Sequence, residues 1–80
     1  MRPTQKHAAE RLDPESYRSV CSHVLQRDGW RCQLCGSITG LQVHHIIPRA
    51  RGGADSQANL LTVCATCHGK IHAGRLDPGP

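Results

Sequence analysis

The sequence predicts one small α+β domain in which a bound metal ion supports a small hydrophobic core. Two C-x-x-C pairs, Cys32/Cys35 and Cys64/Cys67, supply four thiols. The 80 residues include no Phe, one Trp and one Tyr, so the aromatic side chains that usually fill a core are nearly missing. A domain this short is marginal without disulfides, a metal or oligomerisation. We therefore expect the cysteines to stabilise the fold.

The first element is expected to be a helix. In Asp13-Pro14-Glu15-Ser16, an aspartate suited to capping precedes a proline suited to the first helical position. Apolar residues then recur at helical spacing. This stripe consists of Tyr17, Val20, Cys21, Val24 and Leu25. The helix is predicted to end near Asp28, with Gly29 as its stop, and Cys21 is interpreted as a core residue.

Two extended segments and a second helix are expected further along the chain. Residues 41–47 are rich in branched side chains, which is typical of a strand, and Pro48 ends the run. Residues 49–58 are polar and glycine-containing, which indicates a loop. Residues 59–63 favour a second extended segment, and residues 64–73 have a helix-compatible composition.

Residues 14–74 form the expected domain, between a flexible N-terminal arm (1–13) and a disordered tail (75–80). The first residues are polar and contain no secretory signal, and no apolar run is long enough for a membrane span. We therefore expect a cytoplasmic protein without a membrane partner. The net charge of +4 is compatible with a polyanionic partner but does not by itself indicate one.

The two cysteine pairs predict a structural zinc site with Cys32, Cys35, Cys64 and Cys67 as its ligands. In a reducing compartment, paired thiols are interpreted as metal ligands before disulfides. Two C-x-x-C pairs complete a tetrahedral zinc site, and zinc binding then adds to the free energy of folding. The alternatives are four unrelated buried thiols or a redox pair; the second copy of the motif and the lack of a thioredoxin-like pattern argue against the redox pair.

Four histidines lie between and beside the cysteine pairs. His68 and His72 are four residues apart on the expected second helix and so point to one side, as two ligands of one metal would. His44 and His45 are adjacent on the expected strand, where successive side chains face opposite ways. In a regular strand, one of these two rings would bind a metal and the other would point elsewhere. A bend or bulge could bring both rings to one cleft in different roles.

The ordered set of residues over 30–72 resembles the HNH endonuclease motif. The resemblance is carried by Val43-His44-His45-Ile46-Ile47-Pro48, Gly52-Gly53, Asn59-Leu60 and Cys64-Ala65-Thr66-Cys67-His68-Gly69-Lys70-Ile71-His72. The upstream Cys32-x-x-Cys35 is similar to the branch of the family that carries a four-cysteine zinc. The resemblance implies a ββα-metal, treble-clef-like fold, here with an additional N-terminal helix, in a bacterial or phage-encoded protein.

The resemblance also implies a role for each histidine and for Asn59. His45 matches the general base, and Asn59 matches the asparagine that braces the loop between the strands. His44 and His68 match ligands of a catalytic divalent ion, and His72 matches a further ligand that only some branches have. Many relatives have Asp where this chain has His44.

The residue types fit hydrolysis of a DNA phosphodiester bond. A neutral imidazole accepts a proton near neutrality, so His45 would activate a water molecule, and a divalent ion would assist the departing 3′-oxygen. By resemblance, the product would carry a 5′-phosphate. A site of three imidazoles suits zinc, nickel, cobalt or manganese better than magnesium.

DNA is the expected partner, and the contacts are expected to carry little sequence preference. Arg49, Arg51 and Lys70 are the candidate phosphate contacts, and such contacts position a duplex without reading its sequence. The protein would act as a monomer or as a homodimer. Two alternatives remain open at this point: an inert zinc-stabilised module that binds DNA or protein, and the catalytic part of a larger phage packaging assembly.

Overall fold

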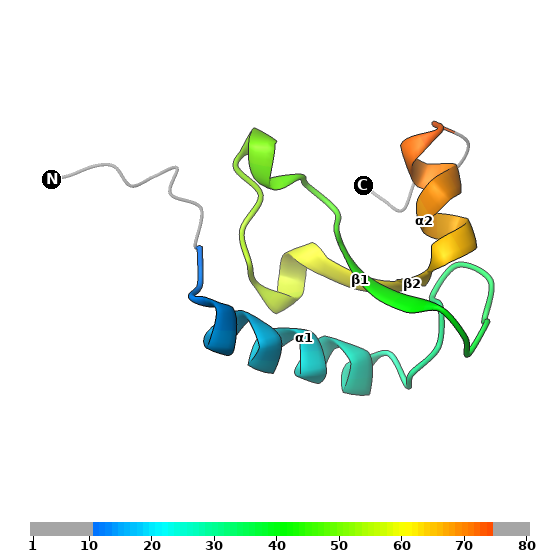
Figure 1. The fold of residues 1–80 in the computed structure, drawn as a ribbon, viewed down its shortest axis with the longest axis horizontal. Coiled ribbons are helices and arrows are strands. Elements are labelled where there is room, and N and C mark those ends of the chain that lie inside the picture. Colours follow the sequence, from blue (N-terminus) through cyan, green and yellow to red (C-terminus); the bar gives the residue numbers. More distant parts are fainter. Residues whose placement is uncertain (1–10, 75–80) are drawn as a thin grey trace, which may run out of the picture.

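The computed structural model describes residues 11–74, which form two helices and a two-stranded antiparallel sheet (Figure 1). The elements in chain order are α1 (Pro14–Arg27), β1 (Leu41–His45), β2 (Leu60–Cys64) and α2 (Ala65–His72). Two short 3-10 turns, Arg49–Arg51 and Gln57–Asn59, lie in the connection between the strands. The expected small α+β fold, with a ββα unit and an additional N-terminal helix, is confirmed.

Helix α1 has the predicted ends. Asp13 accepts a hydrogen bond from the Ser16 backbone N–H at 3.3 Å, which satisfies one of the free donors of the first turn. The helix ends at Arg27, and the chain leaves it through Gly29, whose φ of +69° is a conformation that favours glycine. Residues 1–10 of the predicted arm and the predicted tail lie outside the described residues. Leu12, within the predicted arm, donates a backbone hydrogen bond to Asp55 at 3.1 Å.

The strands pair so that both histidines of β1 lie opposite leucines of β2. His44 pairs with Leu61 and His45 with Leu60. The strand ends at His45, two residues before the predicted end, because Ile47 has left the ladder and its backbone bonds the Asn59 side chain instead. His45 is therefore the last residue of the strand, and its side chain stands at the start of the loop.

Helix α1 is fastened to β2 by two charged side chains at its C-terminal end. Arg27 donates to the carbonyl oxygens of Gln57 and Leu60, both at 2.7 Å. Asp28 accepts from the Thr62 backbone N–H at 2.9 Å and from the Arg27 guanidinium at 2.8 Å. Figure 1 shows α1 along one side of the sheet and α2 standing on the other side at the end of β2.

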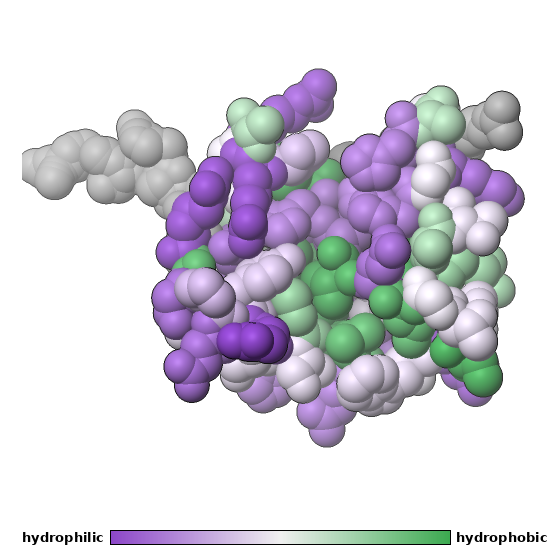
Figure 2. All heavy atoms as spheres, viewed as in Figure 1, coloured by the Kyte–Doolittle hydropathy of each residue, from purple (hydrophilic) through white to green (hydrophobic). Residues whose placement is uncertain are grey.

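The hydrophobic core is small, and thiols form most of its main cluster. The buried members of that cluster are Val63, Cys32, Cys64 and Cys67, with Leu41, Leu61 and Ile71 packed around them. Four large apolar side chains, Trp30, Leu34, Ile38 and Ile47, are exposed. Figure 2 shows hydrophobic residues near the centre of one face, over the sheet, and hydrophilic residues over the loop between the strands. Within residues 11–74, no helix has the length and apolar character of a membrane span.

Candidate active site and metal centre

The four predicted zinc ligands come together at the start of α2. The sulfur atoms of Cys32, Cys35, Cys64 and Cys67 all lie within 4.8 Å of one another. Backbone N–H groups point at two of them: Leu34 donates to the Cys32 sulfur and Cys67 to the Cys64 sulfur, both at 3.4 Å. Cys64 thereby also caps α2. The cluster is suited to a structural zinc, and Cys21 lies apart from it, half-buried on α1.

The pKa values of these thiols indicate that they influence one another strongly at close range. Burial and the three neighbouring sulfur groups raise the pKa of Cys67 to about 12. Burial would also raise the pKa of Cys32, but backbone N–H donors outweigh it and lower that pKa to about 6. Four thiolates in one place repel one another, and a doubly charged ion that binds thiolate removes that repulsion.

A cleft of about 370 Å³ opens between β1, α1 and α2. Its lining consists of Tyr17, Val43, His44, His45, Pro48, Arg49, His68 and His72. All four motif histidines therefore reach one cleft, although two of them are neighbours on a strand. Successive side chains within a strand point to opposite faces of the sheet. Because β1 ends at His45, the His45 side chain need not follow this alternation and can reach the same cleft as His44.

Three imidazoles stand on the α2 side of the cleft. The ring centroids of His44 and His68 are 5.0 Å apart, and those of His68 and His72 are 4.6 Å apart. The Nε2 atoms of His68 and His72 lie 3.1 Å apart. His44 is more distant from His72, at 6.4 Å between centroids. Among the described residues, the cysteines alone have all their ligand atoms within 4.8 Å, so the imidazoles would need to rotate to share an ion.

The environment favours the neutral form of two of these rings, His44 and His68. Burial, followed by the neighbouring His68 and His72, lowers the pKa of His44, and burial and His72 lower that of His68. The Gln42 carbonyl oxygen lies 2.5 Å from Nδ1 of His68 and can only accept a hydrogen bond. Nδ1 of His68 must then carry the hydrogen, and Nε2 presents a lone pair toward His72. This is the state that a metal ligand needs.

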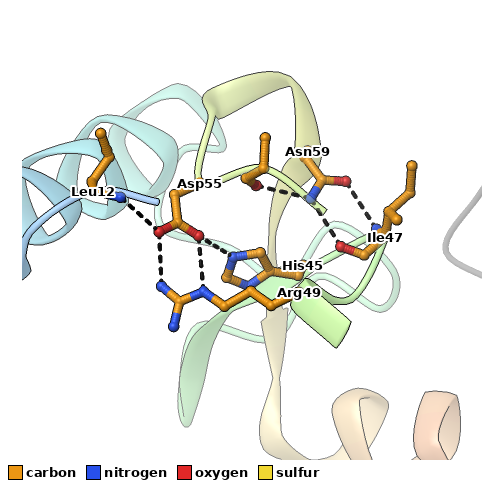
Figure 3. Close-up of polar contacts among 7 residues, drawn as sticks. Leu12, His45, Ile47, Arg49, Asp55 and Asn59 are labelled. Carbon is orange, nitrogen blue, oxygen red and sulfur yellow. Dashed lines mark hydrogen bonds and ion pairs between the residues drawn. The ribbon is translucent and has the colours of Figure 1, made fainter. Parts of the chain in front are cut away.

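His45 lines the same cleft but contacts a buried carboxylate. Its Nε2 lies 2.8 Å from the Asp55 carboxylate (Figure 3). Its ring stacks on Tyr17, with 5.9 Å between centroids and an interplanar angle of 15°. The side chain is 16% exposed, so solvent reaches it. None of the three α2-side imidazoles lies among its hydrogen-bond or stacking partners.

The loop between the strands is braced by Asn59 and Gly53. The Asn59 amide accepts from the Ile47 N–H at 2.8 Å and donates to the carbonyls of Ile47 and Ala54 at 3.0 and 2.9 Å (Figure 3). A Cβ atom on Gly53 would lie 1.6 Å from the Ile47 carbonyl oxygen, so the close approach requires glycine. Asn59 therefore links Ile47 to Ala54 across the loop.

The three candidate phosphate contacts differ in their surroundings. Arg49 is held by Asp55 through two bonds of 2.9 Å, and its guanidinium lies 4.9 Å from the centroid of the Tyr17 ring. Arg51 and Lys70 are exposed and take part in no salt bridge within residues 11–74. Arg49 thus has a structural partner that was not predicted from the sequence, whereas Arg51 and Lys70 have no acidic partner within residues 11–74.

Comparison with known proteins identifies the family of this chain. The profile of the HNH endonuclease family matches residues 32–74, which is more than half of the sequence. The chain belongs to the HNH endonuclease family. It is 31% identical to anaredoxin of a Nostoc species over 64 residues, which cover 79% of this chain and 84% of that protein. It is 34% identical over 62 residues to the type IV methyl-directed restriction enzyme EcoKMcrA of Escherichia coli, covering 66% of this chain but 22% of that enzyme.

Two contacts of His45 in the HNH domain, the cleft residue Tyr17 and the buried Asp55, were not predicted from the sequence. Tyr17 was interpreted as part of the apolar stripe of α1, and nothing local distinguishes it from the rest of that stripe. Asp55 did carry a signal, because it is the one acidic residue between Asp28 and Asp77. A lone carboxylate in a basic stretch is a candidate partner for a neighbouring cation, and the Asp55 side chain is 0% exposed.

The HNH domain should lose stability in acid through Asp55. Burial alone would raise its pKa, but hydrogen bonds from Arg49, His45 and Leu12 hold that pKa well below its usual range. A carboxyl with a lowered pKa stabilises the fold above its unfolded pKa of about 3.9, and this stabilisation is lost as the pH falls through the folded value. Urea denaturation at several pH values below about 5 should show a smaller pH dependence in Asp55→Asn than in the parent. Equal slopes would contradict this assignment.

Proposed function

We propose that this HNH domain is a metal-dependent endonuclease that hydrolyses DNA phosphodiester bonds, with His45 as the general base. The observation that carries the proposal is the division of one cleft between two kinds of imidazole. His44, His68 and His72 stand on the α2 side, and His45 stands apart from them beside a carboxylate. A binding module would use the cysteines but has no need of a separate proton acceptor.

His44, His68 and His72 are the residues that would hold a catalytic divalent ion. The lowered pKa values of His44 and His68 and the hydrogen bond from His68 to Gln42 support neutral ligands. A bound ion would supply positive charge for the phosphate and for the departing 3′-oxygen. Nitrogen ligands favour zinc, nickel, cobalt or manganese over magnesium.

The chain's own residues would perform the remaining steps. His45 would take a proton from the water molecule that attacks phosphorus, while the stack on Tyr17 keeps the ring in place. Arg51 and Lys70, which are exposed and free of salt bridges within residues 11–74, would contact the DNA backbone. Phosphate contacts carry no sequence information, so the sequence preference should be weak.

The proposal predicts two metal sites of different kinds in one chain. Zinc-loaded parent protein should contain two equivalents of metal, and His68→Ala should contain one while keeping its circular dichroism spectrum. Nicking of supercoiled plasmid should follow addition of zinc, nickel, cobalt or manganese to the parent and should be lost in His68→Ala. One equivalent in both proteins, or equal nicking by both, would contradict the second site.

The same assay addresses the alternatives. Methylated and unmethylated plasmids should both be tested, because one relative of this domain is a methyl-directed restriction enzyme of which the chain spans 22% of the length. Nicking of the methylated plasmid alone would show a modification-dependent substrate. Binding of DNA without nicking, under every metal, would favour the inert module or a domain that needs further parts of a larger protein.

A further inference from the structure

Asp55 is a buried carboxylate that gathers donors from three separate segments of the chain. It receives hydrogen bonds from the Leu12 backbone at 3.1 Å, from Nε and Nη2 of Arg49 at 2.9 Å each, and contacts Nε2 of His45 at 2.8 Å (Figure 3). The residue is 1% exposed. Buried carboxylates are costly unless every oxygen is satisfied, and these four contacts from three residues satisfy both oxygens of Asp55.

The ionised state of Asp55 fixes the direction of each of these bonds. Although burial alone would raise its pKa, Arg49 and His45 hold that pKa well below its usual range, so the group is a carboxylate near neutral pH. A carboxylate has no hydrogen to donate. Each neighbour must therefore donate to it, and Nε2 of His45 must carry a hydrogen. In the neutral ring the lone pair is then on Nδ1, which points away from Asp55 because the two ring nitrogens diverge.

We propose that Asp55 is a positioning residue that fixes His45 as its Nε2–H tautomer and leaves Nδ1 as the nitrogen that accepts the proton of water. The part concerning water rests on the proposed function of His45; the tautomer itself rests on the contacts of Asp55. Tyr17 also positions His45: its stacked ring restricts the plane of the imidazole, while the contact with Asp55 restricts rotation of the ring within that plane. Arg49 belongs to this unit, since it bonds Asp55 and lies over Tyr17.

The tautomer of His45 can be read directly from long-range 1H–15N spectra of the zinc-loaded full chain at about pH 8, where free imidazole is mostly neutral. His45→Ala assigns the signals. We expect the parent to show hydrogen on Nε2 and an unprotonated Nδ1, and Asp55→Asn to show mixed or reversed tautomers. Hydrogen on Nδ1 in the parent, or an Asp55→Asn spectrum equal to the parent's, would overturn the proposal. If Asp55→Asn does not fold, the spectrum of the parent still decides.

Kinetics separate positioning from a purely structural role. Asp55→Asn should lower kcat for nicking roughly 100-fold with KM for DNA changed by about twofold or less. Asp28→Asn is the matched control, because the Asp28 carboxylate is also well buried and bound to an arginine and a backbone N–H, but has no histidine among its hydrogen-bond partners. It should lose stability and keep kcat. Equal kcat in Asp55→Asn and the parent would refute the positioning role of Asp55. Equal nicking by His45→Ala and the parent would refute His45 as the general base, and the tautomer of His45 would then be tested by the spectra alone.

Discussion

Substitution of Cys35 by Ser is expected to leave the chain largely unfolded. Structural zinc contributes on the order of 10 kcal/mol to the folding of small zinc domains, whereas a domain of this size has a total stability of only a few kcal/mol. Three of the four sulfurs lie in the main core cluster, whose one other buried member is Val63. Few apolar contacts remain to hold the fold if the ion is lost. Circular dichroism and zinc content of Cys35→Ser, and of parent protein treated with a chelator, measure the effect.

The fifth cysteine provides the control for this experiment. Cys21 is half-buried on α1 and lies outside the sulfur cluster, so Cys21→Ser changes the same chemical group without removing a ligand. It should keep both the spectrum and the zinc. A Cys35→Ser protein with the thermal transition of the parent would show that the four-cysteine centre does not stabilise the domain.

Replacement of His45 by Ala is expected to lower the rate of plasmid nicking by about 10²- to 10⁴-fold, which is the usual contribution of a positioned general base. Because His45 makes its polar contact with Asp55, and not with the imidazoles of α2, metal content should be unchanged. DNA affinity should also be unchanged, since the exposed cations Arg51 and Lys70 are untouched. Single-turnover nicking at saturating DNA measures the chemical step apart from binding.

His23 is the matched control for His45. It is an exposed residue of α1 and does not line the cleft, so His23→Ala should nick at the parent rate. If both variants nick like the parent, the base lies elsewhere in the protein. If His45→Ala loses its metal together with its activity, then His45 is a ligand and its assignment as the base is wrong.

The features that could be predicted from the sequence are those that local signals determine. Asp13, Pro14 and Gly29 set the limits of α1 through capping, fixed φ and positive φ, each of which acts within a few residues. The two C-x-x-C pairs needed one assumption, that they bind a single ion, and their sulfurs do lie together. The family followed from the order of the histidines and cysteines, and the match over residues 32–74 confirms it.

The partners of His45 could not be predicted, because they come from distant parts of the chain. Asp55 lies ten residues further along in the loop, and Tyr17 lies on α1, which packs beside the strands only in the folded state. No periodicity encodes such contacts. The same reason explains Arg49: in the sequence it is a basic loop residue, and its two bonds to Asp55 depend on how the loop closes at Gly53.

The position of Cys64 sets an order of assembly. Its sulfur caps α2 and is also one of the four clustered thiols, and α2 has only eight residues. So short a helix is not stable by itself in water, and it needs an anchored first turn. A zinc ion bound by the four thiolates would anchor this turn, so we expect the cysteine centre to fill before His68 and His72 stand side by side, and any second ion to enter an already folded chain. In a cell short of zinc, newly made chains would then stop before the histidine cleft of the HNH domain is assembled.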